Sequence, residues 1–515
     1  MNAAQVEAEV NRRSFLASGL AAAWPGLSAE GERDPHSLPQ SDVHYRRVRG
    51  YVEDVPVAEY RWAPPAAYER FRDIKYGVRL HWGPYSIGGE PGESWPFLKL
   101  SFAERQRYQS LYKGWNPRGF DAREWMALFA ACGMQMFAFT TKHHDGFSMF
   151  DTRTRVRRRT DWTSPGGPRI EACDLHYSML ETPFRRDVVR ELCEAARERG
   201  IKIDLYFSHP DWYDADFRPY AYHPLQTPSS ASLTDDYAEV KKRLGSAEVI
   251  VPDAAPDEVR RMMTRHREQL TELLTRYGKI DMLCLDQWLG PKVWPELRAT
   301  VLQLRKLQPE VMIRARGIGN YGDYYTPEGF VPGDRDNTNA PWFVIYPLGS
   351  SFSYERLAEK HKGAAWVVRS LTDTVAKGGN FMLGIGPDGD GRFHPTAVSQ
   401  LKEVGAWLRV TGEGIYATRP REGKLWREGD DIRFTQSKDR RTVYAFTLSW
   451  PGTKLVLRSV RARPGSAVRM LGSATALTWR HSDSGLEIEL PPGLQEASRR
   501  PCRFAWGFQI DVEPG

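Results

Sequence analysis

The chain has 515 residues, of which 41% are hydrophobic and 27% are charged, and its formal net charge at pH 7 is +7. This composition is typical of a globular protein with one large domain and a smaller one. The charge is modest, and nucleic-acid binding would need a wider basic face with stacking aromatic residues, so no nucleic-acid partner is predicted. Five cysteines without a Cys-x-x-Cys spacing argue against a disulfide scaffold or a zinc ribbon.

The N-terminal stretch NRRSFLASGLAAAWPGLSAEG resembles a twin-arginine export signal. Arg12 and Arg13 precede a weakly apolar, alanine-rich segment, and cleavage is expected near Ala29, so residues 1–29 are predicted to be the signal. A periplasmic or secreted protein would follow. The alternative is a disordered tail with a chance arginine pair. No later segment has the ~18 continuous apolar residues of a membrane span, so none is predicted.

Predicted strands and helices alternate along most of the chain. Strands are expected at 75–82, 135–144, 201–208, 279–288, 311–317 and 380–387, and helices at 121–134, 185–200, 257–278, 295–308, 355–377 and 396–411. Alternation predicts a parallel sheet, and the number of repeats favours a TIM-like (β/α)-barrel over residues 44–418. The arginine-rich stretch 153–159 is interpreted as a solvated loop, although an anionic partner is left open, and the stretch after 317 as irregular.

The pattern changes near residue 420, where short strands separated by turns replace the alternation. Residues 420–515 are therefore predicted to form a C-terminal β-sandwich, with support of the barrel favoured over glycan contact as its role.

Polar residues gather at the C-terminal ends of the predicted strands, where barrel enzymes carry their chemistry. They are His81, His143, His144, Tyr206, Asp286, Arg314 and Arg316. A barrel zinc site usually needs a His-x-His pair on one strand face, whereas adjacent histidines point to opposite faces unless the strand has ended. Imidazoles, a phenol and a carboxylate suit sugar hydroxyls better, and a metal-dependent hydrolase is the alternative.

Several motifs in one order resemble the α-L-fucosidases of glycoside hydrolase family 29. They include KYGVRLHWGPYSI, FTTKHHDGFSMFD, YGKIDMLCLD and DTVAKGGNFMLGIGPDGDG, and the resemblance runs from about Tyr60 to Pro420 and on into the sandwich. It implies a (β/α)-barrel with a C-terminal β-sandwich, a retaining mechanism and no metal or organic cofactor. The residues that the resemblance assigns are Asp286 as nucleophile, His81, His143, His144 and Tyr206 as contacts to fucose hydroxyls, Arg316 as the site arginine, and Trp95 against the C5 methyl group.

One departure concerns the acid/base residue. The family usually carries Pro-Trp-Glu after the fifth strand, and here Phe343 stands where that glutamate is expected. Glu328 and Glu93 are the replacement candidates, and Asp334 and Asp336 form a weaker third source. The alternative is a glycan-binding pseudoenzyme without an acid/base.

The predicted activity is retaining hydrolysis of α-L-fucosides, or of the related α-L-galactosides, through a covalent glycosyl-aspartate. The predicted partner is a fucosylated oligosaccharide or glycoconjugate. The sequence does not decide the oligomeric state, and a homo-oligomer is left open.

Overall fold

The computed structural model describes residues 38–39, 42–89, 91–218, 220, 223–225, 252–332 and 340–513. The predicted export signal and the candidates Asp334 and Asp336 lie outside the described residues.

The larger domain is built on a seven-stranded parallel sheet. Its strands, in sheet order, are β7 (Met312–Ile313), β6 (Met282–Asp286), β5 (Lys202–Ser208), β2 (Met136–Lys142), β1 (Tyr76–Leu80), β9 (Asn380–Ile385) and β8 (Phe343–Pro347). Between the two edge strands, parallel bridges join Arg314 to Tyr324 and Tyr325 to Trp342. The sheet therefore curls toward closure, and the predicted (β/α)-barrel is confirmed.

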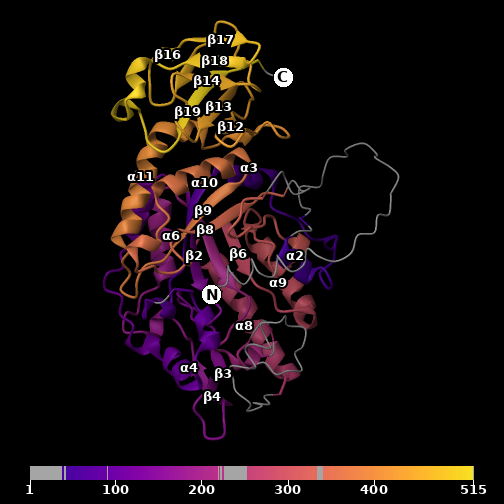
Figure 1. Ribbon diagram of the computed structural model, residues 1–515. Coiled ribbons are helices and arrows are strands. Elements are labelled where there is room, and N and C mark those ends of the chain that lie inside the picture. The colour runs from indigo at the N-terminus through magenta and orange to yellow at the C-terminus, as the bar shows by residue number, and fades with distance from the viewer. Residues whose placement is uncertain are drawn as a thin grey trace, which may run out of the picture.

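Helices surround this sheet (Figure 1). They are α2 (Val43–Val48), α3 (Pro65–Asp73), α4 (Phe102–Tyr108), α5 (Ala122–Ala131), α6 (Val188–Glu198), α8 (Pro256–Thr275), α9 (Trp294–Leu307), α10 (Ala364–Ala376) and α11 (Pro395–Thr411). Helix α6 shows why the alternation was readable: Asp187 caps it by accepting from the Arg190 amide at 3.0 Å, and Gly200 follows its end at φ 67°. Its apolar side chains are buried, as helical spacing predicts.

Several segments differ from the prediction. Strand β7 covers only Met312–Ile313 of the expected 311–317. Strand β8 lies in the stretch expected to be irregular, because its run of five residues is too short to stand out from the surrounding loops. Helix α10 begins at Ala364, after Gly363 at φ 90°, and not near residue 355.

The arginine-rich stretch is also ordered differently from the predicted loop. It forms β3 (Val156–Asp161), which pairs with β4 (Arg169–Leu175) as an antiparallel hairpin. Arg157 pairs with Asp174 at 2.5 Å and Arg159 with Glu171 at 2.7 Å. Arg158 pairs with Glu258. Much of this charge is thus matched by carboxylates on the hairpin itself and on α8.

The predicted C-terminal β-sandwich is confirmed. One antiparallel sheet contains β10 (Arg419–Pro420), β11 (Arg427–Glu428), β12 (Ile432–Gln436), β13 (Thr442–Thr447), β15 (Val468–Met470), β16 (Ala476–Leu477) and β19 (Trp506–Asp511). The other contains β14 (Lys454–Leu457), β17 (Trp479–Ser482) and β18 (Gly485–Glu489). Side chains from both sheets share one apolar core.

The sandwich packs beside α3, α10 and α11 (Figure 1). Arg433 donates to Asp373 of α10 at 2.6 Å, and Lys438 donates to Asp73 at 2.7 Å. Asp73 ends α3 just before β1 begins, so this contact lies at the amino end of the barrel strands. These contacts favour a supporting role, because barrel chemistry takes place at the opposite end.

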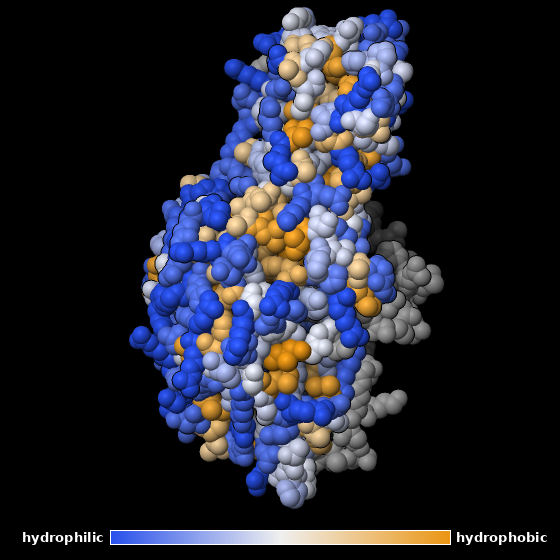
Figure 2. Space-filling model, turned by 90° about the vertical axis from the view of Figure 1, so that its left-hand side faces the viewer, coloured by the Kyte–Doolittle hydropathy of each residue, from blue (hydrophilic) through white to orange (hydrophobic). Residues whose placement is uncertain are grey.

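Figure 2 shows one face of the molecule, where hydrophobic side chains form separate groups among hydrophilic ones. The most exposed large hydrophobic residues of the described chain include Val55, at 79% exposure, and Phe330, at 57%. None of the described helices is both long enough and apolar enough to span a bilayer.

Candidate active site

Asp286 is the last residue of β6, and its carboxylate is buried among donors at the barrel mouth. Tyr206 Oη donates to Oδ2 at 2.6 Å, and Arg316 Nη1 and Arg314 Nη1 donate to Oδ1 at 2.8 and 3.3 Å. Burial by itself would raise the pKa of Asp286, but the charges of Arg316 and Arg314 hold this pKa well below its usual range. Asp286 is therefore a carboxylate at neutral pH, the form in which it can attack an electrophile.

Glu328 shares both guanidinium groups with Asp286. Its Oε1 lies 3.0 Å from Arg314 Nη2 and 2.7 Å from Arg316 Nη2. The Glu328 side chain is 35% exposed, whereas that of Asp286 is 8% exposed. The end of β7 thus brings together two carboxylates with different surroundings, one buried and one open to solvent.

The two adjacent histidines both reach the mouth. Strand β2 ends at Lys142, before them, so strand alternation does not send them to opposite faces. His144 Nε2 lies 3.9 Å from Asp286 Oδ2, and His143 Nδ1 shares a hydrogen bond of 2.5 Å with Ser94 Oγ. The sequence left open whether the strand ends before the two histidines, and in the structure it does.

The three predicted imidazoles are neutral near pH 7. Burial lowers the pKa of His144 to about 4 and the pKa values of His81 and His143 well below 6.5. His81 Nδ1 is 3.0 Å from Thr140 Oγ1. A neutral imidazole has one donor and one acceptor nitrogen, which suits a sugar hydroxyl.

Aromatic rings form a wall beside these imidazoles. The centroid of the Trp95 ring lies 4.7 Å from that of His144 and 5.6 Å from that of Trp212. The Tyr206 ring stacks on His143 with centroids 5.7 Å apart. The structure thus places Trp95 and Tyr206 with the histidines, as the sequence predicts.

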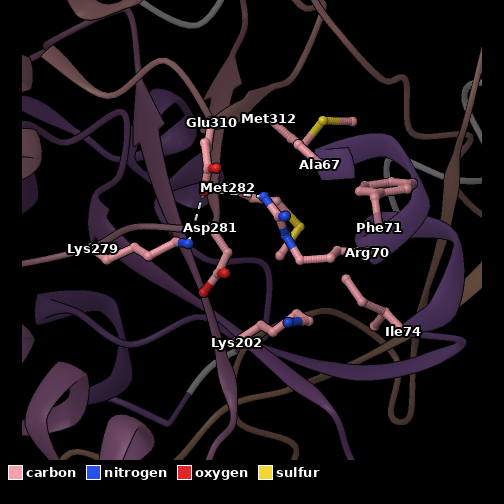
Figure 3. Close-up of a pocket in the computed structure, with 10 residues that line it drawn as sticks. All are labelled: Ala67, Arg70, Phe71, Ile74, Lys202, Lys279, Asp281, Met282, Glu310 and Met312. Atoms are coloured by element: carbon pink, nitrogen blue, oxygen red, sulfur yellow. Dashed lines mark hydrogen bonds and ion pairs between the residues drawn. The ribbon is translucent and has the colours of Figure 1, made fainter. Parts of the chain in front are cut away.

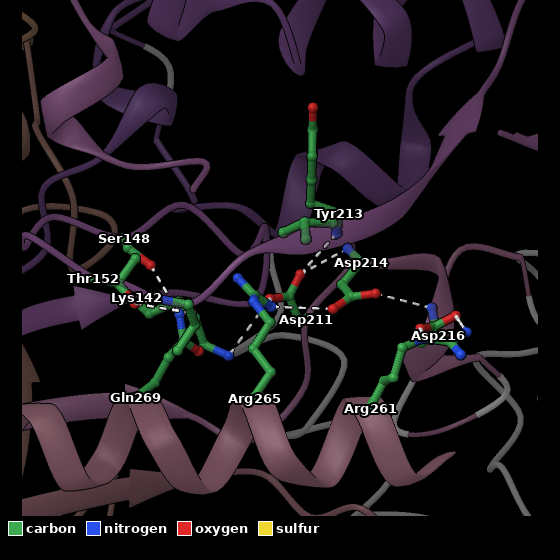
Figure 4. Close-up of polar contacts among 12 residues, drawn as sticks. Lys142, Ser148, Thr152, Asp211, Tyr213, Asp214, Asp216, Arg261, Arg265 and Gln269 are labelled. Atoms are coloured by element: carbon green, nitrogen blue, oxygen red, sulfur yellow. Dashed lines mark hydrogen bonds and ion pairs between the residues drawn. The ribbon is translucent and has the colours of Figure 1, made fainter. Parts of the chain in front are cut away.

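A charged network fixes the loop after β5, which carries Trp212 of this wall (Figure 4). Arg265 rises from α8 and pairs with Asp211 at 2.7 Å and Asp214 at 3.2 Å. Lys142, at the end of β2, lies 3.7 Å from Asp211. The amide of Trp212, inside this loop, donates to the His144 carbonyl at 2.7 Å. The network therefore positions the histidine turn against the loop after β5.

Glu93, the other acid/base candidate, braces two loops at the mouth. Its Oε1 accepts from the Ser353 amide at 2.8 Å. Burial raises the pKa of Glu93 to about 7, against the effect of these backbone bonds. That pKa suits a general acid, but a general acid must also lie within hydrogen-bond reach of the group that it protonates. Within the described residues, no hydrogen bond or ion pair joins Glu93 to Asp286 or to either site arginine, so Glu328 is favoured.

The raised pKa of Glu93 predicts a pH-dependent stability. Its folded-state pKa exceeds the unfolded value. The contribution of Glu93 to folding stability is therefore present below about pH 4.5 and is lost as the pH rises through about 7. Glu93→Gln mimics the protonated form. The melting temperature of the variant should rise relative to wild type as the pH increases from 5 to 8. The corresponding gain in the free energy of unfolding is about 3 kcal/mol at most. The exposed Glu359→Gln is the control, and a pH-independent difference for Glu93→Gln would contradict the assignment.

Phe343 lies away from the catalytic mouth. It is the first residue of β8, at the amino end of the barrel, and is fully buried. Its ring packs against Phe71 with centroids 4.8 Å apart. Since the catalytic mouth lies at the carboxyl ends of the strands, Phe343 replaces no catalytic group there, and the pseudoenzyme alternative loses its supporting feature.

The amino end of the barrel also has a small pocket (Figure 3). Met282 and Met312, the first residues of β6 and β7, contribute to its lining. Glu310 at its rim pairs with Lys279 at 2.9 Å and Arg70 at 3.1 Å. This pocket lies across the barrel from Asp286 and belongs to the end of such folds that serves stability.

Arg314 is the site residue missed by the predicted binding set, which named only Arg316. The spacing Arg-Ala-Arg places the two on one strand face, so alternation was the signal for it. No group of three or more His, Cys, Asp or Glu residues in the described ranges is arranged to hold a metal ion.

A barrel with a buried, ionised carboxylate at its mouth, a second carboxylate beside it and neutral partners for hydroxyls defines a glycoside hydrolase. The family model described as alpha-L-fucosidase matches residues 57–413, and that of the alpha-L-fucosidase C-terminal domain matches residues 428–511. The chain belongs to the alpha-L-fucosidase family.

Related proteins agree with this assignment. The tissue alpha-L-fucosidase of Bos taurus is 28% identical over 494 residues, covering 89% of this chain and 91% of its own. The alpha-L-fucosidase of Branchiostoma floridae is 26% identical, covering 85% and 92%. The solved structure of alpha-L-fucosidase isoenzyme 1 from Paenibacillus thiaminolyticus matches with a TM-score of 0.68 at 25% identity, covering 87% of this chain and 99% of its own.

Proposed function

We propose that this protein hydrolyses α-L-fucosidic bonds in fucosylated oligosaccharides or glycoconjugates with retention of configuration. The observation that carries the proposal is the buried Asp286 carboxylate, kept ionised by Arg314 and Arg316, which also hold Glu328. Retaining glycosidases need such a pair of carboxyl groups flanking the scissile bond.

Each carboxylate has its own role in the proposed reaction. Asp286 attacks the anomeric carbon as the bond to the leaving oxygen breaks, and Glu328, when protonated, gives its proton to that oxygen. The product is a fucosyl-aspartate ester and a free alcohol. In the second step Glu328 takes a proton from water, the water oxygen bonds to the anomeric carbon, and Asp286 leaves as a carboxylate. The hydrogen bond from Tyr206 orients the Asp286 carboxylate for the attack.

The remaining residues would hold the sugar. His81, His143 and His144 offer neutral nitrogen donors and acceptors to the hydroxyl groups of fucose. Trp95 offers an apolar face to the C5 methyl group. Hydroxyl contacts that strengthen in the transition state raise kcat, so these residues contribute to rate as well as to affinity.

The direct test is an assay of the purified protein on an aryl α-L-fucoside and on a fucosyl disaccharide. Proton NMR should show α-L-fucose as the first product, before mutarotation. Initial release of β-L-fucose, or no release from either substrate, would overturn the proposal.

We also propose export through the twin-arginine route, on the strength of Arg12 and Arg13 before the alanine-rich segment. Replacing both arginines with lysine should leave the protein in the cytoplasm. Unchanged periplasmic or secreted yield, by immunoblot of cell fractions, would count against it.

A further inference from the structure

Helix α2 brings an element from outside the family match to the catalytic mouth. The match begins at residue 57, whereas α2 covers Val43–Val48. Asp42 caps the helix by accepting from the amides of His44 at 2.8 Å and Tyr45 at 2.9 Å. The helix is therefore a defined structure and not an arbitrary part of a leader.

The region after β7 holds this segment in place. Val48 is buried, and a Cβ on Gly319 would come within 3.0 Å of Val52 and 3.5 Å of Val48. Gly319 has φ 53°, so the lack of a side chain allows both its backbone conformation and this close approach. The Arg47 guanidinium lies 4.3 Å over the Trp288 ring, two residues beyond Asp286. Packing on both sides thus fixes α2 beside the nucleophile.

The imidazole of His44 is the part of α2 that faces the site. With Arg316 and Thr326, His44 lines a small cavity. Its Nδ1 is buried and has no hydrogen-bond partner among the described residues. Burial and the charge of Arg316 lower the pKa of His44 well below 6.5, so its imidazole is neutral near pH 7. A buried polar atom without a partner is destabilising, which points to a partner that binds at this position.

His44 lies on the side of the site where the leaving group of the substrate is expected, and not on the side of the fucose hydroxyls. In the sheet, β1 and β2 lead to the predicted hydroxyl clamp, whereas β7 lies on the other side of β6 and is followed by the two arginines that hold Glu328. Arg316, on that second side, lines the cavity with His44. The leaving oxygen has to lie beside the acid/base, so the group attached to it lies on the same side.

We infer that His44 hydrogen-bonds to the leaving group of the substrate and makes the enzyme prefer a hydroxylated sugar there. This inference rests on the proposed function and adds a specificity residue to it. A neutral imidazole can donate to or accept from a sugar hydroxyl, whereas the aryl group of a synthetic substrate offers it no comparable hydroxyl.

The test compares His44→Ala with wild type on a fucosyl disaccharide and on an aryl α-L-fucoside. The variant should lower kcat/KM for the disaccharide about five- to tenfold more than for the aryl substrate, the effect of one lost hydrogen bond. His44→Gln, which keeps a donor and an acceptor, should recover part of the preference. His481→Ala, in the exposed part of the sandwich, is the matched control and should leave the substrate ratio unchanged.

The outcomes separate the two proposals. If His44→Ala lowers kcat/KM equally on both substrates, or on neither, the ratio of disaccharide to aryl activity is unchanged. That result would overturn the inference while leaving the proposed fucosidase activity intact. A poorly folded His44→Ala, detected by its melting temperature, leaves His44→Phe to decide, because phenylalanine fills the space without a polar atom, and an unchanged ratio there is equally decisive. A wild-type protein inactive on both substrates would overturn the proposed function and this inference with it.

Discussion

Asp286→Gly will lower kcat at least about a thousandfold, because the variant has no group that can form the covalent intermediate. Added azide should restore part of the rate. The small anion can occupy the space of the lost carboxylate, beside Arg314 and Arg316, and attack the anomeric carbon itself. The product should then be a fucosyl azide of inverted configuration, measurable by NMR.

The azide response separates a catalytic role from a structural one. Removing Asp286 leaves Arg314 and Arg316 buried with Glu328 as their remaining acidic partner in the site, so some loss of stability is expected. Azide can restore the reaction only where a folded active site still binds the fucoside, so rescue would show that the variant is folded. Asp439→Gly, in an exposed turn of the sandwich, is the control. A small loss of kcat for Asp286→Gly, or no fucosyl azide at any azide concentration, would contradict the assignment of the nucleophile.

Glu328→Gln should have an effect that depends on the leaving group. A natural sugar alcohol leaves poorly without a proton, so kcat/KM for a fucosyl disaccharide should fall by about 10²–10⁴. The first step with an aryl fucoside that has an activated phenol should change much less, since this phenol leaves as an anion. The measurement is the ratio of the two kcat/KM values, wild type against variant.

Glu93→Gln is the matched control for that experiment, because it makes the same chemical change in the second candidate. Glu93 is tied to Ser353, while Glu328 lies against both site arginines, so only Glu328→Gln should change the ratio. A changed ratio for Glu93→Gln alone would make Glu93 the acid. If neither variant changes it, both assignments are wrong.

The periodicity of the sequence was sufficient to predict the architecture. Alternating apolar strands and amphipathic helices, such as 201–208 and 185–200, predicted the parallel sheet because hydrophobic period and backbone geometry are locally coupled. Strand β8 was not predicted, because a short apolar run between irregular loops has no distinguishing period.

The sequence was also sufficient to show which side chains stand at strand ends. Asp286, Tyr206 and Arg316 follow from strand direction and alternation, and the structure brings all three into hydrogen-bonded contact. This succeeds because the carboxyl ends of all parallel strands meet at one rim, so local position is enough to infer a shared site.

Which loop residues join that rim depends on long-range packing. Glu328 lies beside Asp286 while Glu93 braces a loop, Phe343 lies at the opposite end of the barrel, and His44 enters from a helix before the first strand. Loop paths and the docking of a terminal helix depend on contacts between residues far apart in the chain, such as Val48 against Gly319. No local period encodes such contacts. The family resemblance could therefore name Glu328, Glu93 and Trp95 as candidates, but the sequence could not show which glutamate reaches the site arginines or that His44 joins the site.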